Sequence, residues 1–124
     1  RKVLGDGQQT LNCLLDQILE TCAIGSSAFS GQVPAMAELL RATLRDLAGR
    51  DHSESGSYAT LQLTALVVHG WHAHCLLTGI NSSSEYERRL DAALQLYAAG
   101  YQNYCHYWAE RALSTLPDYG FTSL

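Results

Sequence analysis

Histidine and cysteine side chains, which are common ligands of soft metal ions, gather at two places in the sequence. They are His69, His72, His74 and Cys75 in one segment, and Cys105 and His106 in another. On a helix, His69 and His72 share one face, because residues three apart lie about one turn from each other. A metal site with two histidines and two cysteines between adjacent helices is therefore one hypothesis. The favoured interpretation is hydrogen bonding inside a bundle or at its rim, because the spacing matches no established ligand motif.

Tyrosine and tryptophan recur at helical spacing in the last third of the chain. The row consists of Tyr97, Tyr101, Tyr104, Tyr107 and Trp108. Such a row most often lies in a core, with the hydroxyl groups reaching its rim. The same residue types also dominate the energetics of protein–protein interfaces. Core packing and partner contact are both open for this row.

The sequence shows no arrangement of catalytic residues. Carboxylates occur singly, not in pairs that would divide the roles of general acid and general base. There is no Gly-x-Ser-x-Gly, Walker-type or dinucleotide-binding motif. We therefore expect a protein that is not an enzyme and that needs no cofactor.

Length and charge narrow the class of protein further. The chain has 124 residues, 47% of them apolar, which suits one globular domain spanning residues 1–124. The formal net charge is −4 and Lys2 is the only lysine, so we expect no nucleic-acid-binding surface. The sequence begins at Arg1 with no apolar leader near its start. It is expected to be a domain of a larger protein or a processed chain.

Apolar residues recur every three to four positions through most of the chain, which is the period of amphipathic helices. The predicted helices cover residues 10–24, 33–48, 58–78 and 84–116. Gly25 and Gly49 follow two of them, and Pro34 suits a first turn. Ser84 and Glu87 form a capping box for the last helix. The prediction is an all-α fold, an antiparallel bundle of four to five helices.

The third predicted helix lies in a segment without charged residues. Residues 55–84 contain no Asp, Glu, Lys or Arg, and their apolar side chains are distributed all around the helix. A helix that is apolar on every side is expected to be buried on every side. A membrane span is not expected, because Gln62, His69, His72 and His74 would each need a partner within the lipid.

A bundle of this size has difficulty covering such a helix alone, so we expect another protein chain to cover part of it. The predicted function is a non-catalytic interaction or oligomerisation domain. Its partner would be a second copy of the chain or a helix of another protein. The residues predicted at this surface are Leu63, Val67, Trp71, Tyr101, Tyr104 and Trp108.

The cysteines leave an alternative open. Cys13, Cys22, Cys75 and Cys105 all fall in apolar helical stripes, where free cysteine behaves as a small hydrophobic residue. This pattern favours buried thiols and an intracellular protein. The even count also permits two disulfides, and residues 81–83 form a glycosylation sequon. The alternative is a secreted, disulfide-stapled bundle that acts as a ligand or carrier.

The segment 89–117 resembles one tetratricopeptide repeat, a pair of helices with small residues where the two helices touch. The matching positions are Gly100 at the turn, Ala93, Cys105 and Ala112 at small-residue positions, and Pro117 at the closing proline. Arg89 and Ala92 depart from the pattern, which has an aromatic and a large aliphatic residue there. The resemblance implies a scaffold that binds peptides or proteins. One continuous helix that tolerates Gly100, at about 1 kcal/mol, is the alternative.

Overall fold

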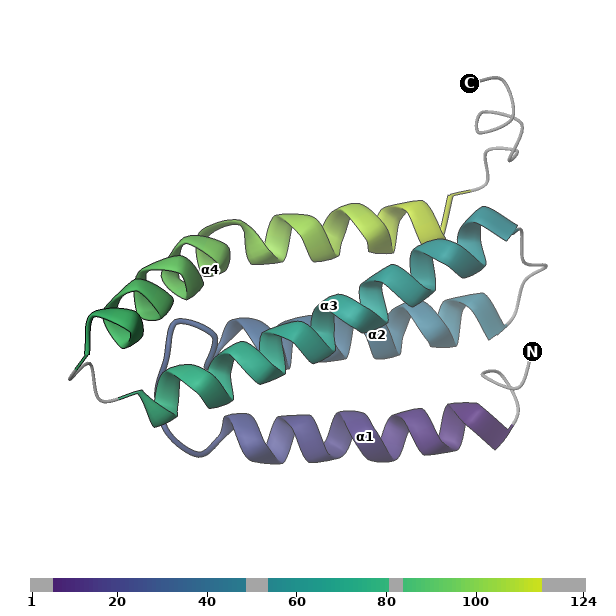
Figure 1. Cartoon of the computed structure of the whole chain (residues 1–124). Coiled ribbons are helices and arrows are strands. Elements are labelled where there is room, and N and C mark those ends of the chain that lie inside the picture. The colour runs from purple at the N-terminus through teal and green to yellow at the C-terminus, as the bar shows by residue number, and fades with distance from the viewer. Residues whose placement is uncertain (1–5, 49–53, 81–83, 115–124) are drawn as a thin grey trace, which may run out of the picture.

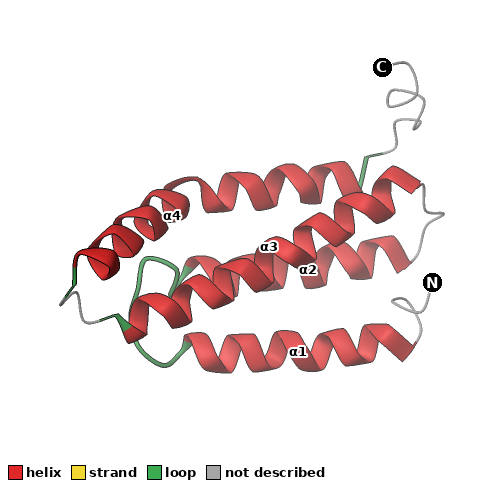
Figure 2. Ribbon diagram, in the orientation of Figure 1, coloured by secondary structure: helices red, strands yellow, loops and turns green. Residues whose placement is uncertain are grey.

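The chain forms four α-helices that pack side by side in the computed structural model, which describes residues 6–48, 54–80 and 84–114 (Figure 1). The helices are α1 (Asp6–Cys22), α2 (Gln32–Ala48), α3 (Glu54–Gly79) and α4 (Glu85–Ala112). Successive helices run in opposite directions, and no strand occurs among the described residues (Figure 2). The predicted all-α antiparallel bundle is confirmed, with four helices.

Local signals in the sequence set the helix ends. Ser84 is the N-cap of α4, and its Oγ accepts a hydrogen bond from the Glu87 backbone amide at 3.1 Å, as the capping box predicts. After α1, Gly25 has a φ of 78°, a left-handed conformation that favours glycine. Pro34 lies in the first turn of α2, where its missing N–H leaves no helical hydrogen bond unmade. Gly49 and the sequon at residues 81–83 lie outside the described residues.

The last helix is continuous. α4 runs through Gly100 without interruption, although it bends along its length (Figure 1). The turn that the repeat resemblance places at Gly100 is not formed, so the alternative of one continuous helix describes α4. Pro117 lies outside the described residues, and the resemblance in sequence stays a prediction.

The core lies between α1, α2 and α3 and extends beneath α4. Leu15 and Ile18 of α1, Leu40 and Leu44 of α2, and Phe29 of the loop between these helices are almost fully buried. α2 packs against all three other helices, whereas α1 packs mainly on α2 and only lightly on α3. Among the described residues the backbones of α1 and α4 do not come close to each other. α3 is therefore held chiefly by α2 and α4.

Tyr101 fixes α4 on α3. Its side chain is fully buried, and its hydroxyl group donates a hydrogen bond to the Leu66 carbonyl oxygen at 2.8 Å. Gly70, four residues later in α3, leaves the space for this ring. A Cβ atom at residue 70 would overlap the Tyr101 hydroxyl and lie 2.8 Å from Cγ2 of Val33. Packing therefore requires glycine at a position where it costs about 1 kcal/mol of helix propensity relative to alanine.

We expect Tyr101→Phe to lower the free energy of unfolding by about 0.5–1.5 kcal/mol, the net contribution of one buried hydrogen bond. Urea denaturation measures the change. Tyr104→Phe is the matched control, because Tyr104 lies on the same helix and is 52% exposed, and it should change stability by less than about 0.5 kcal/mol. Equal losses in the two variants would contradict this role for the Tyr101 hydroxyl.

Candidate functional site

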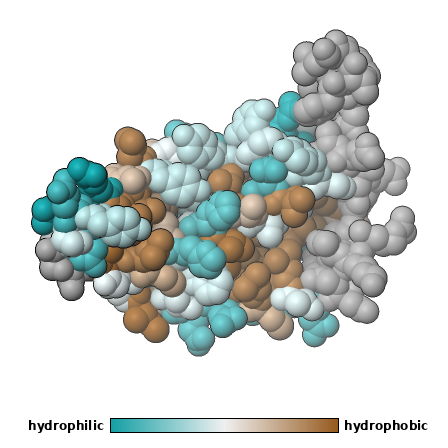
Figure 3. All heavy atoms as spheres, in the orientation of Figure 1, coloured by the Kyte–Doolittle hydropathy of each residue, from teal (hydrophilic) through white to brown (hydrophobic). Residues whose placement is uncertain are grey.

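From Tyr58 to Leu76, the solvent-exposed side of α3 carries no Asp, Glu, Lys or Arg. It consists of six residues at three- to four-residue spacing, which we call the outer face of α3: Tyr58, Leu61, Ala65, His69, His72 and Leu76. Leu61 is 64% exposed, Tyr58 53% and Leu76 49%. Brown, hydrophobic side chains gather on this side of the molecule in Figure 3, between polar ones. From Tyr58 to Leu76 the outer face spans about 27 Å of helix.

The opposite side of α3 holds the outer face in place. Ala59, Leu63, Val67, Gly70 and His74 recur at the same spacing and are buried against the bundle. The expectation that this helix is buried on every side is therefore wrong. The physical reason is that α2 and α4 cover one side of α3, and α1 reaches it only lightly. One side of α3 therefore belongs to the core, and the other side lies at the surface.

The residues predicted at a partner surface separate into three groups by burial. Leu63, Val67 and Tyr101 are fully buried, so they form the core and present no surface to a partner, which corrects the prediction for these three. Trp71 and Trp108 are partly buried and pack against the core, whereas Tyr104 is exposed.

The exposed apolar residues of the outer face are absent from the predicted set. Leu61, Leu76 and Tyr58 lie in the neutral segment, whose apolar side chains are distributed all around the helix and so predict no exposed face. Their positions around the helix relative to Leu63 and Val67 carry the information that these three residues are exposed. If the pair Leu63 and Val67 marks the core, the other three fall on the opposite side.

His74 joins the end of α3 to the loop that follows α1. It is 1% exposed, with Nε2 3.0 Å from the Ile24 carbonyl oxygen and Nδ1 2.7 Å from Ser27 Oγ. Because a carbonyl oxygen only accepts hydrogen bonds, Nε2 carries a proton and donates to Ile24, while Nδ1 shares a second hydrogen bond with Ser27 Oγ. Ser27 Oγ in turn accepts from the Phe29 amide at 3.0 Å. The role of His74 is therefore structural.

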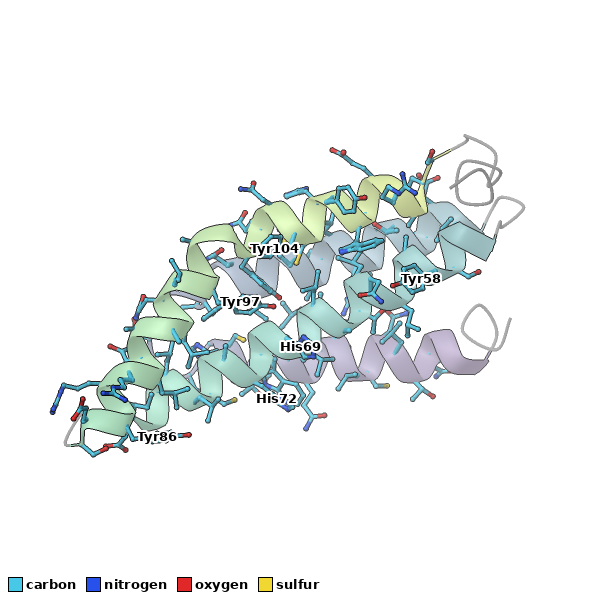
Figure 4. All side chains as sticks on the ribbon, turned by 45° about the horizontal axis from the view of Figure 1, so that its top comes forward. Tyr58, His69, His72, Tyr86, Tyr97 and Tyr104 are labelled. Atoms are coloured by element: carbon cyan, nitrogen blue, oxygen red, sulfur yellow. The ribbon has the colours of Figure 1, made fainter. Side chains whose placement is uncertain are left out.

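The other histidines and cysteines of the sequence cluster are kept apart. His69, His72 and His106 are exposed, whereas Cys105 is buried beside Tyr101. Figure 4 shows His69 and His72 on one side of α3, away from Tyr97 and Tyr104 on α4. Within the described ranges, no three side chains of His, Cys, Asp or Glu come together to hold a metal ion. The arrangement gives no support to a site with two histidines and two cysteines.

The aromatic row on α4 divides between the core and two clusters. Tyr97 packs on Phe29, with ring centroids 5.9 Å apart, and stacks on the exposed Tyr104. Nearer the end of α4, Trp108 meets Tyr107 edge-on at 4.9 Å and meets Tyr58 of α3 at 5.7 Å. The second cluster places Tyr58, the first residue of the outer face, against α4.

All four cysteines are free thiols in this structure. Cys22 and Cys105 are buried as expected, whereas Cys13 and Cys75 are exposed, in contrast to the prediction of a buried stripe. Burial raises the pKa of Cys105 to about 11, against a smaller opposing effect of its hydrogen bond with Tyr101. Burial also raises the pKa of Cys22, and the nearby Cys75 adds to that increase.

These raised pKa values predict a loss of stability at alkaline pH. The folded state keeps the Cys105 proton up to about pH 11, whereas the unfolded chain releases it near pH 9, so high pH favours unfolding. We expect the free energy of unfolding to fall as the pH rises from 9 to 11. Cys105→Ala should reduce the slope of this fall, because its own contribution is removed. Equal slopes in the two proteins, measured by urea denaturation at each pH, would contradict the prediction.

Comparison with known proteins does not assign a role to this chain, so its role is inferred from the structure. No helix among the described residues combines the length and hydropathy needed to cross a bilayer. No family model matches the chain, and no curated protein or solved structure is significantly similar to it. A role for this chain is therefore argued from the outer face of α3.

Proposed function

We propose that this chain is a non-catalytic interaction domain whose outer face of α3 docks on a helix of another chain, with a second copy of this protein as the partner. One observation carries the proposal. Leu61 and Leu76 are large, apolar and about half or more exposed, and they lie on one face of α3 within residues 55–84, which contain no charged residue. Exposed apolar side chains that gather on one face mark interaction sites more often than scattered ones do.

Charge supports a second copy as the partner. The chain as a whole has a net charge of −4, so most of its surface would repel an identical molecule. The outer face of α3 is an exception, because neither Asp nor Glu occurs in the segment from which it is built. Two copies that meet through Tyr58–Leu76 of α3 bring no like-charged side chains of that stretch together.

The shape of the outer face suits a helix. Ala65 lies between Leu61 and His69, and its small side chain lets a partner helix approach closely. Leu61 on one side of Ala65 and Leu76 farther along α3 would then insert between side chains of the partner. The two exposed histidines lie between Ala65 and Leu76 on the same face, and they add polar groups that can form hydrogen bonds within such a contact.

The test is the self-association of the purified chain, measured by sedimentation velocity over a range of concentrations. We expect a reversible dimer in the wild type. Leu61→Asp should raise the dissociation constant of this dimer at least about tenfold, because it would bury a carboxylate in the contact. The fold should be retained, since Leu61 is 64% exposed.

Leu96→Asp provides the matched control. Leu96 is 77% exposed and lies on α4, outside the six residues of the outer face, so this variant introduces the same charge on a different helix. It should dimerise like the wild type. A wild type that remains monomeric at every concentration, or a dimer weakened equally by both variants, would overturn the proposal.

A further inference from the structure

Cys22 and Cys75 lie where the end of α1 meets the end of α3. His74, next to Cys75, bonds the carbonyl oxygen of Ile24, two residues after Cys22, at 3.0 Å. One turn farther along α3, Thr78 packs so closely on Gly25 that a Cβ atom there would lie 2.9 Å from its Cγ2. These two contacts bring the segment 22–25 directly against the segment 74–78.

The two thiols differ in their environment. Cys22 is 3% exposed and Cys75 is exposed to solvent. The pKa of Cys22 is raised by burial and, in addition, by the charge of Cys75, so the two sulfur atoms lie within electrostatic reach of each other. Cys75 is therefore accessible to a reagent, whereas Cys22 is shielded from solvent but close to Cys75.

We propose that Cys22 and Cys75 form a reversible disulfide that ties the end of α1 to α3 when the protein meets a disulfide oxidant such as oxidised glutathione. The bond would reinforce the helix pair that packs most lightly among those in contact in the described structure. This proposal does not depend on the docking of the outer face of α3. None of the six outer-face residues is a cysteine, so Leu61→Asp, which tests the docking, leaves all four thiols in place.

The reaction is a double thiol–disulfide exchange. The Cys75 thiolate attacks one sulfur of oxidised glutathione, a bond forms between Cys75 Sγ and that sulfur, and the other glutathione leaves as a thiolate. The Sγ of Cys22 then attacks Cys75 Sγ and displaces the second glutathione, and the departing glutathione sulfur takes up the Cys22 proton. The two cysteines are oxidised to one disulfide, and one oxidised glutathione is reduced to two thiols.

The other two cysteines are poorly placed for this bond. Cys13 lies nine residues before Cys22 on α1, about 13 Å along the helix, which is too far for the same partner. Cys105 is buried on α4, beside Tyr101. Cys13→Ser therefore serves as a control that removes an exposed thiol without removing the predicted bond.

The experiment is incubation of the folded wild type with oxidised glutathione at neutral pH, followed by alkylation of free thiols and peptide mapping by mass spectrometry. We expect a peptide that links Cys22 to Cys75 and is lighter by two hydrogen atoms than the two free peptides together. The oxidised protein should melt about 5–15 °C higher than the reduced one, and dithiothreitol should reverse the shift. Cys13→Ser should behave in the same way.

Cys75→Ser and Cys22→Ala should both lose the linked peptide and the gain in melting temperature. Alanine is chosen at residue 22 because serine would bury an unpaired hydroxyl group. If glutathione remains attached to Cys75 in the wild type with no linked peptide, the proposal is overturned. A disulfide between the Cys75 residues of two chains would overturn it as well.

Discussion

The contact between Tyr101 and Gly70 determines how the bundle is assembled. The tyrosine ring occupies the space above a residue without a side chain, and its hydroxyl group bonds the Leu66 carbonyl oxygen at 2.8 Å. The position of α4 on α3, and with it the rotation of α3, follows from this contact. Phe29 meets the same ring edge-on, with centroids 5.4 Å apart, so the loop after α1 packs on the same point.

The rotation of α3 determines what the molecule presents to its surroundings. Because Gly70 faces inward with Leu63 and Val67, Leu61 and Leu76 face outward along with His69 and His72. A segment without charged residues thereby supplies a core on one side and a neutral surface on the other. The docking proposed for this chain depends on that surface, whereas the disulfide proposed for Cys22 and Cys75 depends on the meeting of α1 with α3.

The all-α bundle and the approximate ends of its helices could be predicted from the sequence, because local signals carry this information, whereas the sequence left four and five helices both open at Gly100. The hydrogen bond between Ser84 and Glu87 and the positive φ of Gly25 are examples. The surface could not be predicted in the same way. Leu63 and Leu61 are the same residue type two positions apart, and only the neighbours of α3 decide that one is buried and the other exposed. The space above Gly70 likewise requires a ring that comes from another helix.

A double-mutant cycle on Gly70 and Tyr101 tests the central contact most directly, with the free energy of unfolding measured by urea denaturation for Gly70→Ala, Tyr101→Leu and the double variant. If the ring lies on Gly70, the smaller leucine makes room for the added methyl group. The double variant should then lose at least about 1 kcal/mol less than the sum of the single losses. Losses that add to within about 0.5 kcal/mol would contradict the contact and the rotation of α3 that follows from it.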